Sequence, residues 1–224
     1  MKPVTVVFDM IGTCFSLDEP RQRLAALGAP DLALTLWFAQ TLRDAFALSH
    51  AGGYRPLQEV LTAELPRTLK LLDVEATPTQ MSDLVSSFSE LAPQPDALAS
   101  FQALAQAGIE IVALTNGSQQ STRKLLERAE CLTYFSRICS ADTVKKTKPH
   151  PDVYGMLSPI EGDVWMIAAH AWDIAGAIRA GFKTAFITQT EREYLAVYPA
   201  PAMSAQNLSD AVAKILATLG DRAS

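Results

Sequence analysis

Short runs of apolar residues alternate with longer amphipathic stretches over much of this chain. The runs are rich in Val, Ile and Ala, a composition typical of parallel strands that are buried on both faces. The strands predicted on this basis are VTVVFD (4–9), IEIVALTN (109–116), RICSAD (137–142), VWMIAA (164–169) and KTAFIT (183–188). We expect these strands to form the core of the molecule.

Helix signals separate the later runs from one another. Pro95 and Asp96 precede a segment in which apolar residues recur at helical spacing. Ser118 is placed to cap a second helix, and a third helix is expected from Asp173 through Ala180. This regular alternation of strands and helices indicates an α/β fold, in which right-handed crossovers join the strands of a parallel sheet.

Residues 15–92 follow a different pattern, with helical periodicity and no convincing strand. The helical segments are LAALGA, LALTLWFAQTLRDAFALSH, LQEVLTAELPRTLKLL and TQMSDLVSSFSELAP. Because this block follows the first strand and the strand–helix alternation resumes after it, we predict an all-helical cap inserted into the sheet domain. The predicted domains are a core of residues 1–14 and 93–224 and a cap of residues 15–92.

The composition limits the size of the core and the class of partner. The chain has 224 residues, 49% of them hydrophobic, which suffices for one sizeable core and a smaller satellite domain. Its formal net charge is −5, so neither a nucleic-acid partner nor a membrane partner is expected. The apolar segment 34–38 is interpreted as the core of the cap, with a homodimer surface as the alternative.

Three cysteines without metal-like spacing are expected to be reduced thiols. The chain shows no leader-like segment and no apolar run of about 18 residues. These features predict a cytoplasmic protein without a membrane span.

Polar residues gather where the predicted strands end. In a parallel sheet, ligands bind at the carboxyl ends of the strands. The residues found there are Asp9, Gly12, Thr13, Thr115, Asn116, Gly117, Ser118, Lys148, Tyr154, His170, Trp172 and Asp173. Each alone is explained by structure, as a helix cap, a turn, a surface loop, a hydrogen-bonded histidine or a core tryptophan. Together, at four successive strand ends, they favour an active site.

Taken together, these motifs resemble those of a known superfamily. DxxGT after an N-terminal strand, then a strand ending in TN, then KPxPxxY and an acid after the fourth strand are similar to motifs of the haloacid dehalogenase superfamily. The resemblance covers essentially the whole chain. It implies a Rossmann-like core, a helical cap over the site, and an aspartate nucleophile corresponding to Asp9.

The resemblance leaves the reaction type to be decided. Superfamily members that transfer phosphoryl groups carry DxDGT, where the second Asp acts as general acid and base, and here Ile11 occupies that position. The acidic pattern that these members use for Mg²⁺ is also incomplete, because Ala169 replaces its first acid. A Mg²⁺-dependent phosphatase is therefore the alternative, with Mg²⁺ only weakly expected.

The L-2-haloacid dehalogenase branch tolerates a nonacidic residue at the position of Ile11. The sequences AWD (171–173) and TNGS (115–118), and a tyrosine six residues after Lys148, resemble that branch. The implied chemistry needs no cofactor. The carboxylate of Asp9 displaces halide from a small 2-halo carboxylic acid, and water positioned by Asp173 hydrolyses the resulting ester. Lys148 is expected to keep Asp9 ionised.

The same resemblance assigns the remaining site residues. Thr115 and Asn116 are expected to hold the carboxylate or oxyanion of the substrate, and Trp172 to form a wall around the halogen. The other expected substrate contacts are Ile11, Phe38, Tyr154 and Arg43.

Three positions depart from the pattern of the branch. A tyrosine is usual where Ile11 stands, and an arginine where Phe38 follows the cap tryptophan. Arg43 and Arg55 are the candidates to replace that arginine, although Arg43 lies about 140° around the helix from Phe38. His170 replaces an asparagine, and a histidine there can orient water or substrate or exchange a proton.

A protein that has lost catalysis and serves as a binding module is the nonenzymatic alternative. The departures at Ile11 and Phe38 keep it open. The joint presence of Asp9, Lys148 and Asp173 argues against it, because buried charges are unfavourable unless they are used.

Overall fold

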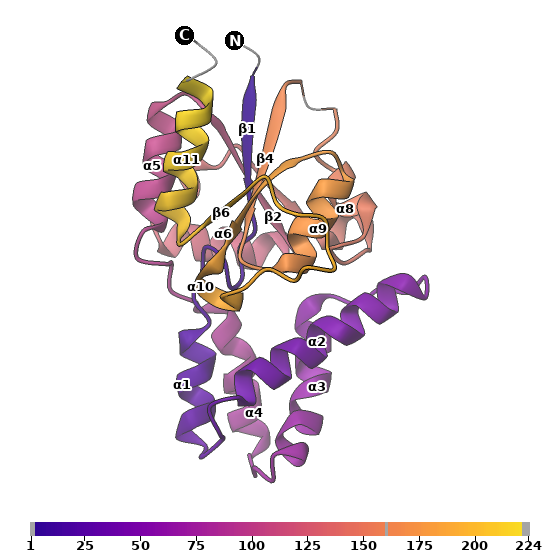
Figure 1. Cartoon of the computed structure of the whole chain (residues 1–224). Helices are drawn as coiled ribbons and strands as arrows, with labels where there is room; N and C mark the ends of the chain where they lie inside the picture. The colour runs from indigo at the N-terminus through magenta and orange to yellow at the C-terminus, as the bar shows by residue number, and fades with distance from the viewer. Residues whose placement is uncertain (1–2, 160, 221–224) are drawn as a thin grey trace.

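The computed structural model describes residues 3–159 and 161–220, so residues 1–2 and 221–224 of the predicted core lie outside the described part. A parallel sheet with the strand order β3-β2-β1-β4-β5-β6 forms its centre. The strands are β1 (Val4–Phe8), β2 (Glu110–Thr115), β3 (Arg137–Ser140), β4 (Asp163–Ala168), β5 (Lys183–Ile187) and β6 (Met203–Ala205). The predicted α/β fold with a parallel sheet is confirmed (Figure 1).

β1 lies inside the sheet and is paired on both sides. Its Val6 stands opposite Ile111 of β2 and Trp165 of β4, and all three side chains are buried. This burial on both faces explains why the strand reads as an unbroken apolar run. The pairing of β1 with β2 and β4 also brings the carboxyl ends of these three strands next to one another.

Two features of the sheet differ from the prediction. β6 is an edge strand of three residues, which is too short to produce a strand pattern in the sequence. The predicted strand 137–142 ends early, at Ser140, because the hydroxyl of that residue accepts the N–H of Asp142 and caps the short helix α7 (Ala141–Val144).

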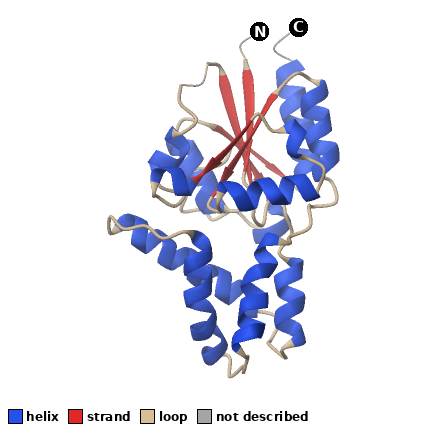
Figure 2. Cartoon of the chain, turned by 180° about the vertical axis from the view of Figure 1, so that it is seen from behind, coloured by secondary structure: helices blue, strands red, loops and turns tan. Residues whose placement is uncertain are grey.

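Helices cover both faces of the sheet (Figure 2). On one face, α5 (Ala97–Gln106), α6 (Gln119–Arg128) and α11 (Leu208–Gly220) contribute to a common apolar cluster. The other face is packed against α7, α8 (Pro151–Gly155) and α9 (Ala171–Arg179). The short α10 (Thr188–Glu191) and the 3-10 turn η2 (Leu132–Tyr134) complete this part of the chain.

The helix signals in this domain agree closely with the structure. Ser118 caps α6, since its hydroxyl accepts the N–H of Ser121 at 3.0 Å. α9 begins at Ala171, two residues before the predicted start at Asp173. The side chains of the AWD segment therefore belong to the first turn of a helix.

The segment between β1 and α5 is helical throughout. It contains α1 (Asp18–Ala26), α2 (Ala33–His50), α3 (Leu57–Leu71), α4 (Pro78–Ser86) and the 3-10 turn η1 (Ser87–Ser89). These helices lie below the sheet domain in Figure 1 and share an apolar cluster of their own, in which Leu34, Trp37 and Phe38 are buried. Leu34, Trp37 and Phe38 thus belong to the apolar interior of this helical segment, which is called the cap below.

The two chain crossings between the sheet domain and the cap run side by side. The N–H of Ser16 donates to the carbonyl of Ala92, and the N–H of Gln94 donates to that of Cys14, both at 2.8 Å. Phe15, at the start of the predicted cap range, packs in the apolar cluster of the sheet.

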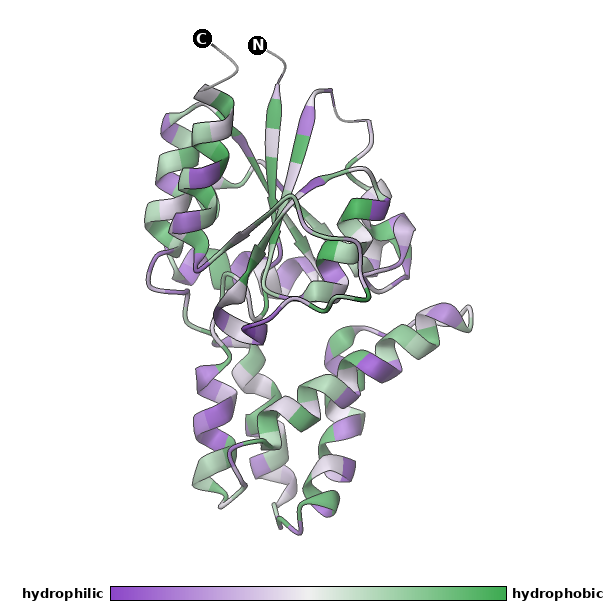
Figure 3. Ribbon diagram, viewed as in Figure 1, coloured by the Kyte–Doolittle hydropathy of each residue, from purple (hydrophilic) through white to green (hydrophobic). Residues whose placement is uncertain are grey.

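In Figure 3, hydrophobic colour runs along most of β1, whereas α1 is largely polar. None of the described helices has both the length and the apolar composition needed to cross a bilayer.

We predict that Gly176→Ala destabilises the protein. A Cβ at this position of α9 would lie 2.4 Å from the hydroxyl oxygen of Tyr154, whose side chain is buried. Overpacking of this kind costs about 1–3 kcal/mol of the free energy of unfolding, which urea denaturation measures. Gly155→Ala in α8 is the matched control, because beyond its chain neighbours and its own helix backbone no atom would lie within 4 Å of the added Cβ. A Gly176→Ala variant as stable as the wild type would refute the close packing.

Candidate active site

Asp9 follows β1 and is 4% exposed, at the edge of the sheet that faces the cap. The hydroxyl of Thr13 donates to Asp9 Oδ2 at 2.6 Å and accepts the N–H of Ala169 at 2.9 Å. The turn after β1 is thereby joined to the end of β4. This bonding holds the Asp9 carboxylate in a defined orientation.

Lys148 lies between two buried carboxylates. Its ammonium is 2.8 Å from Asp9 Oδ1 and 2.6 Å from Asp173 Oδ2, and it also donates to the carbonyl of Leu114 at 2.9 Å. All three N–H donors of the ammonium are used. A fully buried lysine is tolerated here because its charge is paired and hydrogen-bonded.

The two carboxylates have different proton affinities. Burial alone would raise the pKa of Asp9, but the charge of Lys148 and the hydrogen bond from His170 outweigh it and hold this pKa well below its usual range. The pKa of Asp173 is raised by burial and by the negative charge of Asp9, against the opposing effect of Lys148. Asp9 is therefore suited to be an ionised nucleophile and Asp173 to be the stronger base.

Tyr154 lies behind Asp173. Its hydroxyl donates to Asp173 Oδ1 at 2.6 Å, and the side chain is buried against Gly176. The structure therefore places Tyr154 in contact with the acid, and its predicted contact with substrate stays a prediction.

Thr115 and Asn116 are bound to backbone groups. The hydroxyl of Thr115 accepts the N–H of Gly117 at 3.0 Å, and the amide oxygen of Asn116 accepts the N–H of Lys148 at 2.8 Å. These bonds shape the loop after β2 and fasten it to the Lys148 loop. A direct contact of either side chain with substrate, as predicted from the sequence, stays a prediction.

His170 touches the carboxylate of Asp9. Its Nδ1 is 3.3 Å from Asp9 Oδ2, and the side chain is buried. The ring stacks on Trp172, with centroids 5.3 Å apart, and is tilted against Phe38 at 6.4 Å. Phe46 also packs against Trp172, with ring centroids 5.1 Å apart, so that two cap residues, Phe38 and Phe46, extend this aromatic group.

Neither arginine proposed as a replacement reaches the site. The side chain of Arg43 is 53% exposed and pairs with Asp44, and Arg55 is exposed beside Glu59. The prediction of Arg43 as a substrate contact is not supported by this geometry. Phe38 is buried and faces the site, and Arg43, five residues further along α2, points in a different direction.

A small cavity of about 70 Å³ opens between the cap and the loops after β1 and β2. Its walls include Ile11, Leu57 and Phe88, and Gly117 and Ser118 at the start of α6 line its other side. Ile11 packs against both the apolar cluster of the sheet and that of the cap. The cavity is mainly apolar, and Ser118, the residue that caps α6, lies on its wall.

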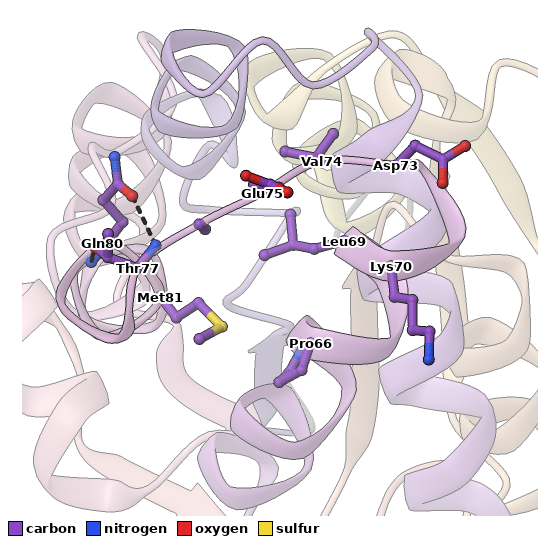
Figure 4. Close-up of a pocket in the computed structure, with 10 residues that line it drawn as sticks. Pro66, Leu69, Lys70, Asp73, Val74, Glu75, Thr77, Gln80 and Met81 are labelled. Atoms are coloured by element: carbon purple, nitrogen blue, oxygen red, sulfur yellow. Dashed lines mark hydrogen bonds between the residues drawn. The ribbon is translucent and has the colours of Figure 1, made fainter.

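A larger hollow of about 870 Å³ lies far from Asp9, between α3 and α4 (Figure 4). Its charged side chains, Lys70, Asp73 and Glu75, are exposed, and its hydrogen bond between Thr77 and Gln80 caps α4. We therefore locate the chemistry at the buried charges around Asp9 and not in the larger hollow.

The surroundings of Asp9 do not fit a Mg²⁺ site. Mg²⁺ requires near-octahedral oxygen ligation, whereas the ammonium of Lys148 lies between the two carboxylates of this site. Within the described part of the chain, no group of three or more His, Cys, Asp or Glu residues is arranged to hold a metal.

Comparison with known proteins agrees with this geometry. The model of a family described as haloacid dehalogenase-like hydrolase matches residues 4–181. The chain belongs to this family. The resemblance inferred from the strand-end motifs is thus confirmed, and the protein is a hydrolase.

Relatives of this hydrolase include dehalogenases. An (S)-2-haloacid dehalogenase of Xanthobacter autotrophicus is 28% identical over 199 residues, covering 85% of this chain and 77% of that protein. The structure of an L-2-haloacid dehalogenase from that organism, with chloropropionic acid covalently bound, superposes with a TM-score of 0.84 at 21% identity and covers 96% and 99% of the two chains. Another L-2-haloacid dehalogenase reaches a TM-score of 0.89 at 23% identity, covering 96% and 100%.

The structure adds Glu191 to the residues collected at the strand ends, and it shows which contact Thr13, already among them, makes. Thr13 belongs to the DxxGT motif, and its place beside Asp9 could have been inferred from that motif. Glu191 accepts the N–H of Ala171 at 2.9 Å from the short helix α10, and no motif pointed to it.

We predict that Lys148→Met lowers the free energy of unfolding by about 3–5 kcal/mol near pH 7, because it leaves two buried carboxylates without a counter-ion. In the variant, both folded-state carboxyl pKa values rise above their unfolded values, so their destabilising effect grows with pH. The deficit relative to wild type should therefore be smaller near pH 5, as urea denaturation at the two pH values would show. Lys124→Met, at an exposed lysine, is the control. Equal stability of Lys148→Met and wild type near pH 7 would contradict the buried ion pairs.

Proposed function

We propose that this hydrolase releases halide from a small 2-halocarboxylic acid and forms the 2-hydroxy acid. The observation that carries the proposal is the ionised carboxylate of Asp9, held by Lys148 at 2.8 Å and flanked by Ile11 in place of a second acid. The covalently bound chloropropionic acid in a related dehalogenase supports a covalent intermediate.

The first step is a displacement at carbon. An oxygen of Asp9 attacks the α-carbon, the carbon–halogen bond breaks, and the halide leaves with its electron pair. The product is an ester between Asp9 and the 2-carbon of the acid. Since one displacement occurs at the α-carbon, its configuration is inverted.

The second step is hydrolysis of the ester. Water attacks the carboxyl carbon of Asp9, and Asp173, whose pKa is raised, accepts a proton from it. The bond between that carbon and the oxygen of the substrate breaks, releasing the 2-hydroxy acid and restoring the Asp9 carboxylate. One water is consumed per turnover, and one halide and one proton are released.

The cavity suits a small substrate. Its volume of about 70 Å³ is far below the roughly 300–1,000 Å³ of drug-sized pockets. Ile11 and Phe88 supply apolar walls for the carbon chain, and the start of α6 at Ser118 can receive the carboxylate. The expected partner is thus a small-molecule carboxylate, and a homodimer and a cytoplasmic location stay predictions.

Phosphoryl transfer is less well supported by the same residues. Ile11 offers no acid or base to a leaving group, and the ammonium of Lys148 takes the place between Asp9 and Asp173 that a metal would need. A lapsed binding protein would not require two buried carboxylates with separated pKa values.

We predict that wild-type protein releases halide from 2-chloropropionate or chloroacetate equally well with and without a chelator, and that Asp9→Asn abolishes this release. Ion chromatography measures the halide, and hydrolysis of a generic phosphoester with added Mg²⁺ is assayed in parallel. Arg43→Gln serves as the matched control, since the exposed Arg43 pairs with Asp44 outside the site. Phosphate release that depends on Mg²⁺, without halide release, would overturn the proposal.

We also predict the path of the oxygen atoms. In a single turnover in ¹⁸O-water with excess enzyme, the hydroxyl oxygen of the product comes from Asp9 and carries no label. Mass spectrometry should find the label in the peptide that contains Asp9. Label in the product of the first turnover would show direct attack by water and exclude the ester.

A further inference from the structure

The charge of the site is unbalanced without a second cation. Asp9 and Asp173 contribute two negative charges and Lys148 one positive charge, all of them buried. A 2-halocarboxylate brings another negative charge, and its displacement produces a halide ion. Because charges interact strongly in a poorly solvated site, a net negative cluster disfavours both anions.

Lys148 cannot supply the missing interaction. Its three N–H donors are already bound to Asp9, Asp173 and the carbonyl of Leu114. Among the described residues, the buried basic side chains are Lys148 and His170. Any further buried positive charge at this site must therefore come from His170.

His170 has a ring N–H to offer. Its Nδ1 faces Asp9 at 3.3 Å, and Nε2 has no hydrogen-bond partner in the described part of the chain. The Nε2 edge of the ring lies against Gly12, where a Cβ would meet Nε2 at 3.2 Å and Cε1 at 2.9 Å. Gly12 has a φ of +83°, a backbone conformation that glycine adopts readily. The absence of a side chain at Gly12 also leaves room for the imidazole ring.

We propose that His170, as an imidazolium, is the anion receptor of this site and holds the negative group of the ligand, either the carboxylate or the departing halide, beside Asp9. The identity of the ligand rests on the proposed function, whereas anion binding itself needs no turnover. No bond to His170 is made or broken, and its proton stays on the ring.

The surroundings of His170 favour its charged form. The acids that face it are Asp9 after β1, Asp173 in α9 and Glu191 in α10, and the aromatic ring of Phe38 faces it from the cap. Burial opposes the charge, but the hydrogen bond and charge of Asp9 and the charges of Glu191 and Asp173 outweigh it and raise the pKa of His170. The imidazolium therefore persists to higher pH than in an ordinary histidine and is lost as the pH rises through this raised pKa.

α10 holds the receptor in position. The carboxylate of Glu191 accepts the N–H of Ala171, the residue that follows His170, and the hydroxyl of Thr190 donates to the carbonyl of Gly12 at 3.2 Å. One short helix thus contacts the residues on both sides of the imidazole. Glu191 is a positioning residue that also supports the charge.

An NMR titration tests the receptor directly in the full chain. The protein has three histidines, so the Cε1–H signal of His170 is assigned by its loss in His170→Asn. The pH titration is recorded with sodium bromide, with sodium propionate, and at equal ionic strength with p-toluenesulfonate, a much bulkier anion that the buried ring is expected to exclude. We expect bromide, propionate or both to raise the pKa of His170 and to leave the signal of the exposed His50 unchanged.

Comparing the two small anions shows which group of the ligand binds at His170. A response to bromide alone assigns the receptor to the halide, and a response to propionate alone assigns it to the carboxylate. Equal titration curves of His170 in all three salts would overturn the proposal, as would a shift of the same size at His50.

Glu191→Gln provides a second, independent variant. Its amide oxygen can still accept the N–H of Ala171, but the negative charge is gone, so the pKa of His170 should fall. In a halide-release assay, the loss of kcat/KM at high pH should then begin at lower pH than in wild type. His170→Asn should lack this pH-dependent loss and have a kcat/KM about ten- to a hundredfold lower at neutral pH, as expected for removing a hydrogen bond to a charged group.

The two experiments separate the two proposals. Bromide or propionate bound at His170 without any halide release would leave the receptor standing and refute the proposed function. Halide release with an unchanged pH profile in both His170→Asn and Glu191→Gln would support the function and refute the receptor.

Discussion

The arrangement of the site depends on one interaction, the ammonium of Lys148 shared between the carboxylates of Asp9 and Asp173. Two ionised acids this close and this deeply buried would repel one another, and either could avoid the repulsion only by taking up a proton. The shared ammonium permits both to be buried, and the remaining partners then divide their roles. Thr13 donates to Asp9, the charge of Lys148 and the hydrogen bond with His170 lower the pKa of Asp9, and Tyr154 donates to Asp173.

The sheet is what brings these groups together. β1 lies between β2 and β4, so Asp9 is presented beside the residues that follow both neighbouring strands. The cap encloses this edge from the other side, with Phe38 against His170 and Phe46 against Trp172. Because low polarity strengthens interactions between charges, this aromatic cover contributes to the chemistry as well as to the packing.

The sequence predicted the α/β fold and the strand-end cluster because both depend on simple patterns, namely buried runs and polar residues that follow them. It could not predict which way each side chain turns. Tyr154, Thr115 and Asn116 occupy expected positions, yet they bond to Asp173 and to backbone groups, which is decided by loop conformation. Two further residues show the same limit of sequence-based prediction. Arg43 was predicted to contact substrate but lies on the exposed surface, whereas Glu191 contacts the site although no sequence motif includes it.

The central claim is that Asp9 becomes esterified during turnover. Its most direct test is rapid quenching of wild-type protein mixed with 2-chloropropionate, followed by digestion and mass spectrometry. The account predicts a transient adduct on the peptide that contains Asp9, with the mass of the substrate less its halide, which forms as halide is released and then decays. Halide release without such an adduct, or with an adduct on another residue, would contradict it.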